Sequence, residues 1–166
     1  MKTLYLIRHA KSDWSIENLH DIDRPLNARG YHNAHQMSFI LKTKKFMPDL
    51  IISSPAIRAI STALIFSRNL DYNLSKIAIK KSLYESSVKD YIDCILGLSE
   101  DCRSVMIFGH NPIITDCANS LTKSFTEEIP TTGIVGIQSK APKWKSILDQ
   151  LNELIYFDFP KNHPNE

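Results

Sequence analysis

The sequence predicts an α/β layer fold built on a mainly parallel β-sheet. Short apolar runs alternate along the chain with segments of helical periodicity, which is typical of strands joined by crossover helices. The first run, residues 3–7, offers apolar side chains to both faces, as central strands of parallel sheets do. A chain of 166 residues, 43% hydrophobic and 23% charged, has the size and composition of one globular domain. We therefore expect a single domain over residues 1–159 and a flexible tail over residues 160–166.

The same periodicities place the individual elements. Asn27 is the expected N-cap of a helix that reaches about residue 44. Ser54 and Pro55 supply an N-cap and a first-turn proline for a helix to about residue 69. Ser87 caps a third helix, a fourth follows Asn111, and a last helical segment precedes the final strand. The expected strands are residues 3–7, 50–53, 77–79, 105–108, 133–138 and 154–159.

Composition and charge exclude several classes of protein. The net charge is +2 and the densest basic cluster is residues 42–45, which argues against nucleic acid as a partner. No apolar run approaches the roughly 18–20 residues that span a bilayer, so no membrane association is expected. The apolar stretch at the start is too short for a signal peptide, which indicates a cytoplasmic protein. The three cysteines lack CxxC spacing and are expected to be reduced packing residues.

Polar residues follow three of the expected strands where packing has no use for them. Arg8 and His9 follow the first strand, Arg58 lies one turn into the helix after the second, and His110 follows the strand at 105–108. Ligands of open α/β sheets bind outside the carboxyl ends of the strands, so neighbouring strands would bring these four residues together. Two arginines suit a tetrahedral oxyanion, and nearby helix starts add N–H groups and positive dipole ends. The sequence therefore predicts a phosphoryl-binding site.

Two histidines beside two arginines indicate phosphoryl-transfer chemistry. Neighbouring cations lower the pKa of an imidazole, so one ring could stay neutral near pH 7 and attack phosphorus to form a phosphohistidine. The second histidine, as an imidazolium, would stabilise the equatorial oxygens together with the arginines. No cofactor or metal ion is then required, and the Asp and His residues in this region have no recognisable metal-ligand spacing.

These residues resemble the motifs of the histidine phosphatase superfamily, also called the phosphoglycerate mutase-like family. Its marks are an Arg-His pair after the first strand, an Arg in the helix after the second, and a second His after a late strand. Five blocks between residues 4 and 112 look like its SixA-type phosphohistidine phosphatase branch: LYLIRHAKSDW, DIDRPLNARG, PDLIISSPAIRAISTA, LYE and FGHNP. The resemblance implies a three-layer α/β/α sandwich with a mostly parallel central sheet.

The resemblance also implies a role for each matching residue. His9 would be the nucleophile that accepts the phosphoryl group, and Arg8, Arg58 and His110 would bind that group. Many members of the superfamily use a Glu before the middle helix to protonate the leaving group, and Glu85 stands at the comparable place. Asp13 is the alternative proton donor.

Three further residues are candidates for substrate binding. Arg24 would either line the mouth of the pocket or hold its loop through Asp21 or Asp23. Ser12 and Asn111 would contact the substrate or serve as loop and cap residues.

We therefore expect a metal-independent phosphatase that acts through a phosphohistidine on His9. The resemblance implies phosphohistidine on a protein as the substrate, and short connections between the motifs leave little room for a lid. One alternative is a phosphatase of small phosphoesters from the same superfamily, and another is a phosphate-binding module without catalysis. A mutase would need a closed site and substrate-gripping insertions, which a chain of 166 residues hardly accommodates.

Overall fold

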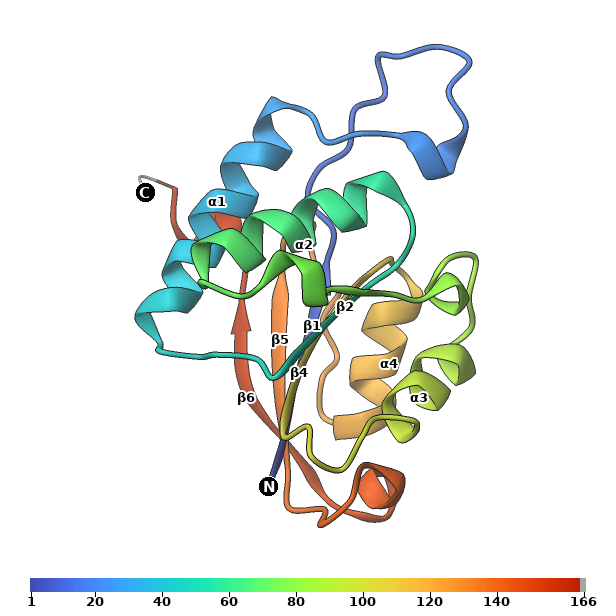
Figure 1. Cartoon of the computed structure of the whole chain (residues 1–166), viewed down its shortest axis with the longest axis vertical. Coiled ribbons are helices and arrows are strands. Elements are labelled where there is room, and N and C mark those ends of the chain that lie inside the picture. The colour runs from blue at the N-terminus through green and yellow to red at the C-terminus, as the bar shows by residue number, and fades with distance from the viewer. Residues whose placement is uncertain (165–166) are drawn as a thin grey trace.

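A six-stranded mixed sheet forms the centre of the molecule (Figure 1), in a computed structural model that describes residues 1–164. Four neighbouring strands are parallel. Beyond β1, the strand β5 pairs antiparallel with β1, and β6 pairs antiparallel with β5. The order across the sheet is β3 (Ala78–Ile79), β2 (Leu50–Ser53), β4 (Ser104–Gly109), β1 (Lys2–Arg8), β5 (Ile134–Ser139) and β6 (Asn152–Asp158). The mostly parallel α/β sheet predicted from the sequence is confirmed.

Four α-helices cover the two faces of this sheet (Figure 1). The helices are α1 (Ala28–Thr43), α2 (Ile57–Asn69), α3 (Val88–Leu96) and α4 (Ile113–Thr122). Buried side chains of α1 and α2 share one hydrophobic cluster with the sheet, and those of α3 and α4 share the other. The molecule is therefore a three-layer α/β/α sandwich.

Alternate residues of the central strand supply these two cores. Leu4 and Leu6 of β1 pack on the side of α3 and α4, whereas Tyr5 and Ile7 pack on the side of α1 and α2. This arrangement explains why residues 3–7 are apolar on both faces of the strand. Burying an aliphatic side chain of this kind contributes about 1.5–3 kcal/mol, so a polar substitution in β1 would weaken the layer that the substituted side chain faces.

Helix boundaries follow the sequence signals with some exceptions. Asn27 caps α1 by accepting a hydrogen bond from Gly30 N, and Ser87 forms a capping box with Asp90 at the start of α3. The second helix begins at Ile57, later than expected, because Ser54 and Pro55 occupy the turn after β2. The last helical segment, η4 (Trp144–Asp149), is a 3-10 helix. Shorter 3-10 turns are η1 (Asp21–Asp23), η2 (Leu74–Lys76), η3 (Lys81–Leu83) and η5 (Pro160–Asn162).

The chain after β6, where a flexible tail is expected from the sequence, makes several contacts with the domain. One carboxylate oxygen of Asp158 pairs with His163 Nε2 at 2.8 Å, and the other accepts a hydrogen bond from the Asn162 amide at 3.0 Å. Gln36 of α1 donates to the carbonyl of His163 at 2.6 Å. These contacts hold η5 and His163 beside α1, and residues 165–166 lie outside the described residues.

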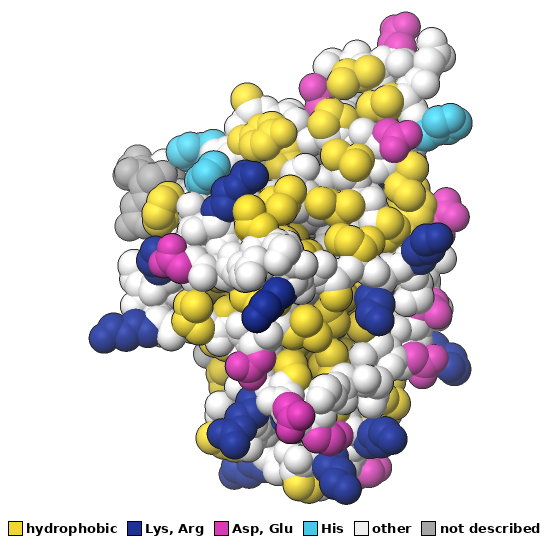
Figure 2. Space-filling model, in the orientation of Figure 1, with side chains coloured by type: hydrophobic (Ala, Val, Ile, Leu, Met, Phe, Trp, Pro, Cys, Tyr) yellow, Lys and Arg dark blue, Asp and Glu magenta, His cyan; other side chains and the backbone are white. Residues whose placement is uncertain are grey.

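The surface carries both signs of charge. Figure 2 shows Lys and Arg side chains interspersed with Asp and Glu over the face in view, in keeping with the net charge of +2. The three cysteines are free thiols, with Cys102 and Cys117 buried and Cys94 half-buried. Among residues 1–164, none of the helices combines the length and the apolar character that crossing a membrane requires.

Candidate active site

The carboxyl ends of β1, β2 and β4 lie side by side at one edge of the sheet. Arg8 pairs in register with Gly109, and Ser53 pairs with Phe108. The pairing extends one residue beyond each strand, since His9 N donates to Gly109 O at 3.1 Å and Ser54 N donates to Phe108 O at 3.0 Å. Side chains from three separate parts of the sequence therefore meet here, as the strand-end pattern predicted.

His9 has one ring nitrogen held by the backbone and the other left for a ligand. Its Nδ1 lies 2.7 Å from the carbonyl oxygen of Ala10, an acceptor, so Nδ1 carries the proton and Nε2 carries the lone pair. The Ala10 N–H donates to Thr62 Oγ1 at 3.0 Å, and Thr132 N donates to the His9 carbonyl at 3.2 Å. These hydrogen bonds fix the backbone of His9 and Ala10, and with it the position of the His9 imidazole.

The His9 imidazole is neutral at physiological pH. Burial of the ring lowers its pKa to about 3, and the neighbouring charges of His110, Arg58 and Arg8 lower it in the same direction. The hydrogen bond to Ala10 acts in the opposite direction but does not overcome them. A buried neutral imidazole with a free Nε2 is a nucleophile that needs no base to activate it.

His110 faces His9, with 5.1 Å between the ring centroids. Its Nε2 lies 2.7 Å from Ser54 Oγ, and its backbone N–H donates to the hydroxyl of Tyr91 at 3.1 Å. Burial and then the charge of Arg58 lower the pKa of this imidazole to about 4. His110 is therefore neutral in the ligand-free site, whereas the sequence analysis expected an imidazolium. The cause is its burial beside two guanidinium groups, which the sequence does not reveal.

Arg58 is positioned by Asp21. Its Nη1 donates to the Asp21 carbonyl at 2.7 Å, and its Nη2 forms an ion pair with Asp21 Oδ2 at 3.0 Å. The hydroxyl of Tyr84 donates to the same carboxylate oxygen at 2.7 Å, and the ring of Tyr84 packs edge-on against His110. Burial acts to raise the pKa of Asp21, but these hydrogen bonds outweigh it and hold the pKa below its ordinary value. Asp21 therefore stays ionised and fixes the guanidinium.

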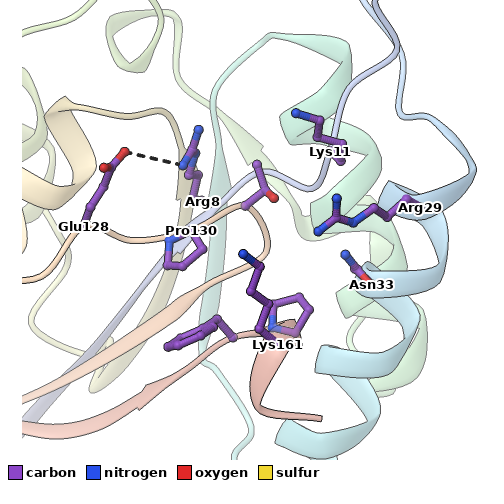
Figure 3. A pocket seen from close by; sticks show the side chains of 10 residues that line it. Arg8, Lys11, Arg29, Asn33, Glu128, Pro130 and Lys161 are labelled. Carbon is purple, nitrogen blue, oxygen red and sulfur yellow. Dashed lines mark ion pairs between the residues drawn. The ribbon is translucent and has the colours of Figure 1, made fainter. Parts of the chain in front are cut away.

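Arg8 is held by the segment before β5 rather than by Asp21. Its Nη1 donates to the Ile129 carbonyl at 3.0 Å and lies 3.9 Å from Glu128 Oε1 (Figure 3). Its Nε is buried and makes no hydrogen bond within the part of the chain that the structure describes. A buried donor without a partner is costly, and such groups concentrate at sites that bind a ligand.

The two candidate proton donors have different surroundings. Glu85 lines a hollow of about 440 Å³ together with Arg58, His110 and Asp21. Its backbone is left-handed, with φ at 50°, a conformation that non-glycine residues adopt mainly at constrained sites. Asp13 accepts two hydrogen bonds from Ser15, which lower the pKa of its carboxyl.

The three remaining candidate residues make contacts within the protein. Arg24 stacks on the ring of Trp14, 3.7 Å from its centroid, and donates to the Asp13 carbonyl at 3.2 Å. Ser12 is buried in an isolated β-bridge with Leu26. The Asn111 amide donates to the Ile129 carbonyl at 2.8 Å, so this side chain braces the loop that also holds Arg8.

Some residues of the site were not singled out from the sequence. They are Ser54, which contacts His110, Thr62, which holds the Ala10 N–H, and Tyr84. From the sequence, Asp21 is expected only as a partner of Arg24, whose Nε lies 3.8 Å from its carboxylate, while the shorter contacts go to Arg58. Both Asp21 and Tyr84 stand inside the blocks DIDRPLNARG and LYE, which was the available signal.

No group of three or more His, Cys, Asp or Glu side chains is placed to hold a metal ion among residues 1–164. The positive charge at this edge comes instead from Arg8 and Arg58, with uncapped starts of α2 and α4 beside them. Guanidinium groups and helix N-termini are donors for a tetrahedral oxyanion.

Comparisons with known proteins identify the family of this chain. Residues 4–94 match the histidine phosphatase superfamily (branch 1). A structure from Agrobacterium tumefaciens, assigned as the phosphohistidine phosphatase SixA, superposes with a TM-score of 0.81 at 25% identity over 96% of this chain and 98% of that one. The protein histidine phosphatase SixA in complex with tungstate gives a TM-score of 0.83 at 20% identity, with 96% and 98% covered.

Curated relatives include both short and long proteins. An uncharacterised protein of Mycobacterium leprae is 26% identical over 93% of this chain and 100% of its own length. Phosphoglycerate mutase 1 of Saccharomyces cerevisiae is 38% identical, but over only 43% of this chain and 30% of the mutase. The likeness to the mutase is thus confined to one part of each chain.

Proposed function

Since this chain belongs to the histidine phosphatase superfamily and is a phosphatase, we propose that it hydrolyses phosphohistidine on proteins through a phosphohistidine on its own His9. The observation that carries the proposal is the state of the His9 ring. It is neutral, its Nδ1 is held by the Ala10 carbonyl, and its Nε2 makes no hydrogen bond within residues 1–164 and lies near the charges of Arg58 and Arg8. This arrangement supports nucleophilic attack on a bound phosphoryl group.

Arg8, Arg58 and His110 bind the phosphoryl group in this proposal. The two guanidinium groups supply paired N–H donors close to both histidines, and the starts of α2 and α4 add backbone donors. A bound dianion favours protonation of the neighbouring imidazole, so His110 gains its charge from the substrate rather than before it. These donors are already in place before the phosphoryl group gains charge in the transition state. They therefore stabilise that charge without having to move.

The reaction then proceeds in two displacements. Nε2 of His9 attacks phosphorus, the new N–P bond forms, and the P–N bond to the substrate imidazole breaks with its electron pair leaving on that nitrogen. A protonated substrate ring leaves as neutral imidazole, so little help is needed from an acid. Water next attacks the phosphorus on His9, loses a proton, and releases orthophosphate while Nε2 recovers its lone pair.

Glu85 is the better placed of the two carboxyl groups to take the proton that the attacking water loses. It lines the same hollow as Arg58 and His110, whereas Asp13 lies apart from that hollow. The hydrogen bonds from Ser15 also lower the pKa of the Asp13 carboxyl, which makes it a weaker acceptor for the proton that the water loses.

The substrate class is supported by the shape of this edge of the sheet. Two of the three connections at this edge, from β2 to α2 and from β4 to α4, span only residues 54–56 and 110–112, whereas the loop after β1 spans residues 9–27. Such short turns suit a site reached by a phosphorylated side chain on another protein. A phosphatase of small phosphoesters would share every chemical step, and the match to a mutase over part of the chain keeps it as the second candidate.

The mechanism is tested with the His9→Ala variant and a phosphohistidine peptide. We expect the variant to lose at least about a thousandfold in kcat and to keep measurable affinity for orthophosphate, since Arg8 and Arg58 remain. In the wild-type protein, rapid acid-free quenching should trap a phosphate on His9, located by mass spectrometry of the digest. Turnover by the variant at the wild-type rate, or a phosphate on His110 instead, would contradict the proposal.

The substrate is tested by comparing kcat/KM for the phosphohistidine peptide with kcat/KM for sugar phosphates and nucleotides. The proposal expects the peptide to be preferred. Preference for a small phosphoester would assign the second candidate, and phosphate binding without turnover of any substrate would indicate a binding module.

A further inference from the structure

A second hollow, lined by cations, lies next to Arg8, and Arg58 is not among the residues that line it. It has a volume of about 480 Å³, and four cations line it, namely Arg8, Lys11, Arg29 and Lys161, against the single carboxylate of Glu128. Figure 3 shows these side chains around one space, with Lys11, Arg29 and Lys161 coming from three different segments of the chain. We call this space the basic hollow. In a protein of net charge +2, such a local excess is a concentrated positive field.

Three of these cations are unpaired. Within residues 1–164, the side chains of Lys11, Arg29 and Lys161 have neither a hydrogen bond nor an ion pair. Glu128 is engaged with Arg8 and with the Asn111 amide, at 3.9 Å and 3.2 Å. Like charges held together repel one another, and an anion in the hollow would relieve that repulsion.

The backbone holds the cations in this arrangement. Asn27 N donates to the Lys11 carbonyl at 3.0 Å, and a Cβ on Gly30 would lie 2.2 Å from the same oxygen. Lys11 is therefore packed directly against the first turn of α1, which contains Arg29 and no acidic residue. Cations are disfavoured at a helix N-terminus and anions are favoured there, so these positions fit a bound anion better than an empty hollow.

Asn33 supplies an independent sign of a ligand. Its side chain faces the basic hollow (Figure 3), it is only 7% exposed, and its amide makes no hydrogen bond to the rest of the described chain. A side chain that is largely buried, with its amide open to the hollow, has its donors available for a group that enters there. An oxygen atom of a bound group would accept from this amide.

The basic hollow continues into a neighbouring one. A space of about 330 Å³ shares Arg29, Asn33 and Lys161 with it and is further lined by His32 and Pro164. The two together form a groove that runs from Arg8 along α1. Because the groove extends over both hollows, it suits an extended chain better than a single small anion. Pro130 and Phe159 add apolar side chains to its wall.

We propose that this groove binds an acidic polypeptide segment next to the phosphorylated side chain, with a carboxylate held by Lys11, Arg29, Asn33 and Lys161. The inference rests on the proposed function, because it identifies the phosphorylated substrate as a protein with acidic residues around its phosphohistidine. Arg8 lines the groove and also lies beside His9, so the phosphoryl group and the carboxylate would occupy adjacent positions.

The test compares two phosphohistidine peptides of equal length. One carries Glu and Asp on both sides of the phosphohistidine, and the other carries Gln and Asn at the same places. We expect the wild-type protein to prefer the acidic peptide by about tenfold in kcat/KM, mainly through KM, because partly exposed ion pairs each contribute modestly. The triple variant Lys11→Gln, Arg29→Gln, Lys161→Gln should lose this preference and keep its activity on the neutral peptide. Higher ionic strength should weaken the preference only in the wild type.

A matched control removes the same charge elsewhere. Lys140, Lys143 and Lys145 are exposed and follow β5, whose end pairs with the amino end of β1, far from the groove. The variant Lys140→Gln, Lys143→Gln, Lys145→Gln should keep the full preference. If it loses the preference as the groove variant does, net charge rather than the groove is responsible and the inference is wrong.

The remaining outcomes separate this inference from the proposed function. Equal turnover of both peptides by the wild type would overturn the groove and leave the function intact. If neither peptide is hydrolysed, the function is wrong, and the groove is decided by fluorescence anisotropy with labelled peptides that carry a stable phosphonate analogue of phosphohistidine. Equal affinities would overturn it. Groove-dependent preference for fructose 1,6-bisphosphate over fructose 6-phosphate, without any peptide preference, would assign a small molecule instead.

Discussion

The carboxylate of Asp21 connects residues that lie far apart in the sequence. It accepts a hydrogen bond from Tyr84 and pairs with Arg58, while its backbone carbonyl takes a second hydrogen bond from the same guanidinium. Arg58 is thus held from two directions before any ligand binds. An arginine fixed in this way loses less conformational entropy when it closes on an anion.

The Asp21→Asn variant should therefore lower kcat/KM for a phosphohistidine peptide by about tenfold. The amide still accepts from Tyr84 but no longer pairs with the charge of Arg58, and the half-exposed position moderates the loss. The decrease should appear mainly as a higher KM, measured by steady-state kinetics. Asp23→Asn is the matched control, because Asp23 is an exposed carboxylate of the same turn, η1, and should behave as the wild type. Equal effects of the two substitutions would contradict the role of Asp21.

At the scale of single residues, the sequence predicted which side chains meet but not their protonation states or ion pairs. The convergence of Arg8, His9, Arg58 and His110 followed from where strands end, and strand ends are visible in the pattern of apolar runs. The neutrality of His110 depends on burial and on Arg58, and both arise only from packing. The pairing of Asp21 with Arg58 depends on the path of a long loop, which has no periodicity to read.

At the scale of elements, close backbone contact fixes where α1 begins. A Cβ on Gly30 would lie 2.2 Å from the Lys11 carbonyl oxygen, so the helix can approach the loop after β1 only with glycine at this position. The neighbouring atom belongs to the backbone and is itself hydrogen-bonded to Asn27 N, and it cannot move away as a flexible side chain would.

Gly30→Ala should destabilise the protein by about 2–3 kcal/mol and also reduce the preference for acidic peptides, because Lys11 and Arg29 would separate. Urea unfolding followed by circular dichroism measures the first effect. Gly97→Ala is the control, since its added Cβ would lie 3.2 Å from the Asp93 carbonyl and Gly97 already has right-handed backbone angles. If Gly30→Ala were as stable as Gly97→Ala, the close contact would not matter for folding.

Element positions were predicted best where caps and periodicity agreed. Asn27 and Ser87 both cap helices as expected, since their side chains accept backbone N–H groups within one turn. The prediction of Ser54 as the N-cap of α2 was wrong. The Ser54 hydroxyl contacts His110 and accepts a hydrogen bond from Ala56 N, so the helix starts only at Ile57. The contacts of Asp158 with Asn162 and His163 could not be predicted from composition, and the flexibility of the tail stays a prediction.

At the scale of the whole molecule, the site places two neutral imidazoles inside the folded protein. The pKa is about 3 for His9 and about 4 for His110, against 6.5 for an ordinary histidine. Burial is the main cause for both, so the shifts disappear when the chain unfolds. Between pH 6.5 and about 4, the two histidines bind protons in the unfolded chain but not in the folded chain. The free energy of unfolding therefore falls as the pH falls through this window.

The free energy of unfolding should therefore be smaller at pH 5 than at pH 7, by on the order of 2 kcal/mol for each of the two imidazoles. The carboxyl groups with lowered pKa values, such as Asp21 and Asp158, contribute stability that is lost only as the pH approaches and passes below their ordinary value of 3.8. The interval from pH 7 to pH 5 therefore isolates the histidines. Urea unfolding at both values, for the wild type and for the double variant His9→Asn, His110→Asn, makes the measurement. The double variant should show a drop smaller by about 4 kcal/mol, and an unchanged drop would mean that the two imidazoles already bind protons in the folded protein.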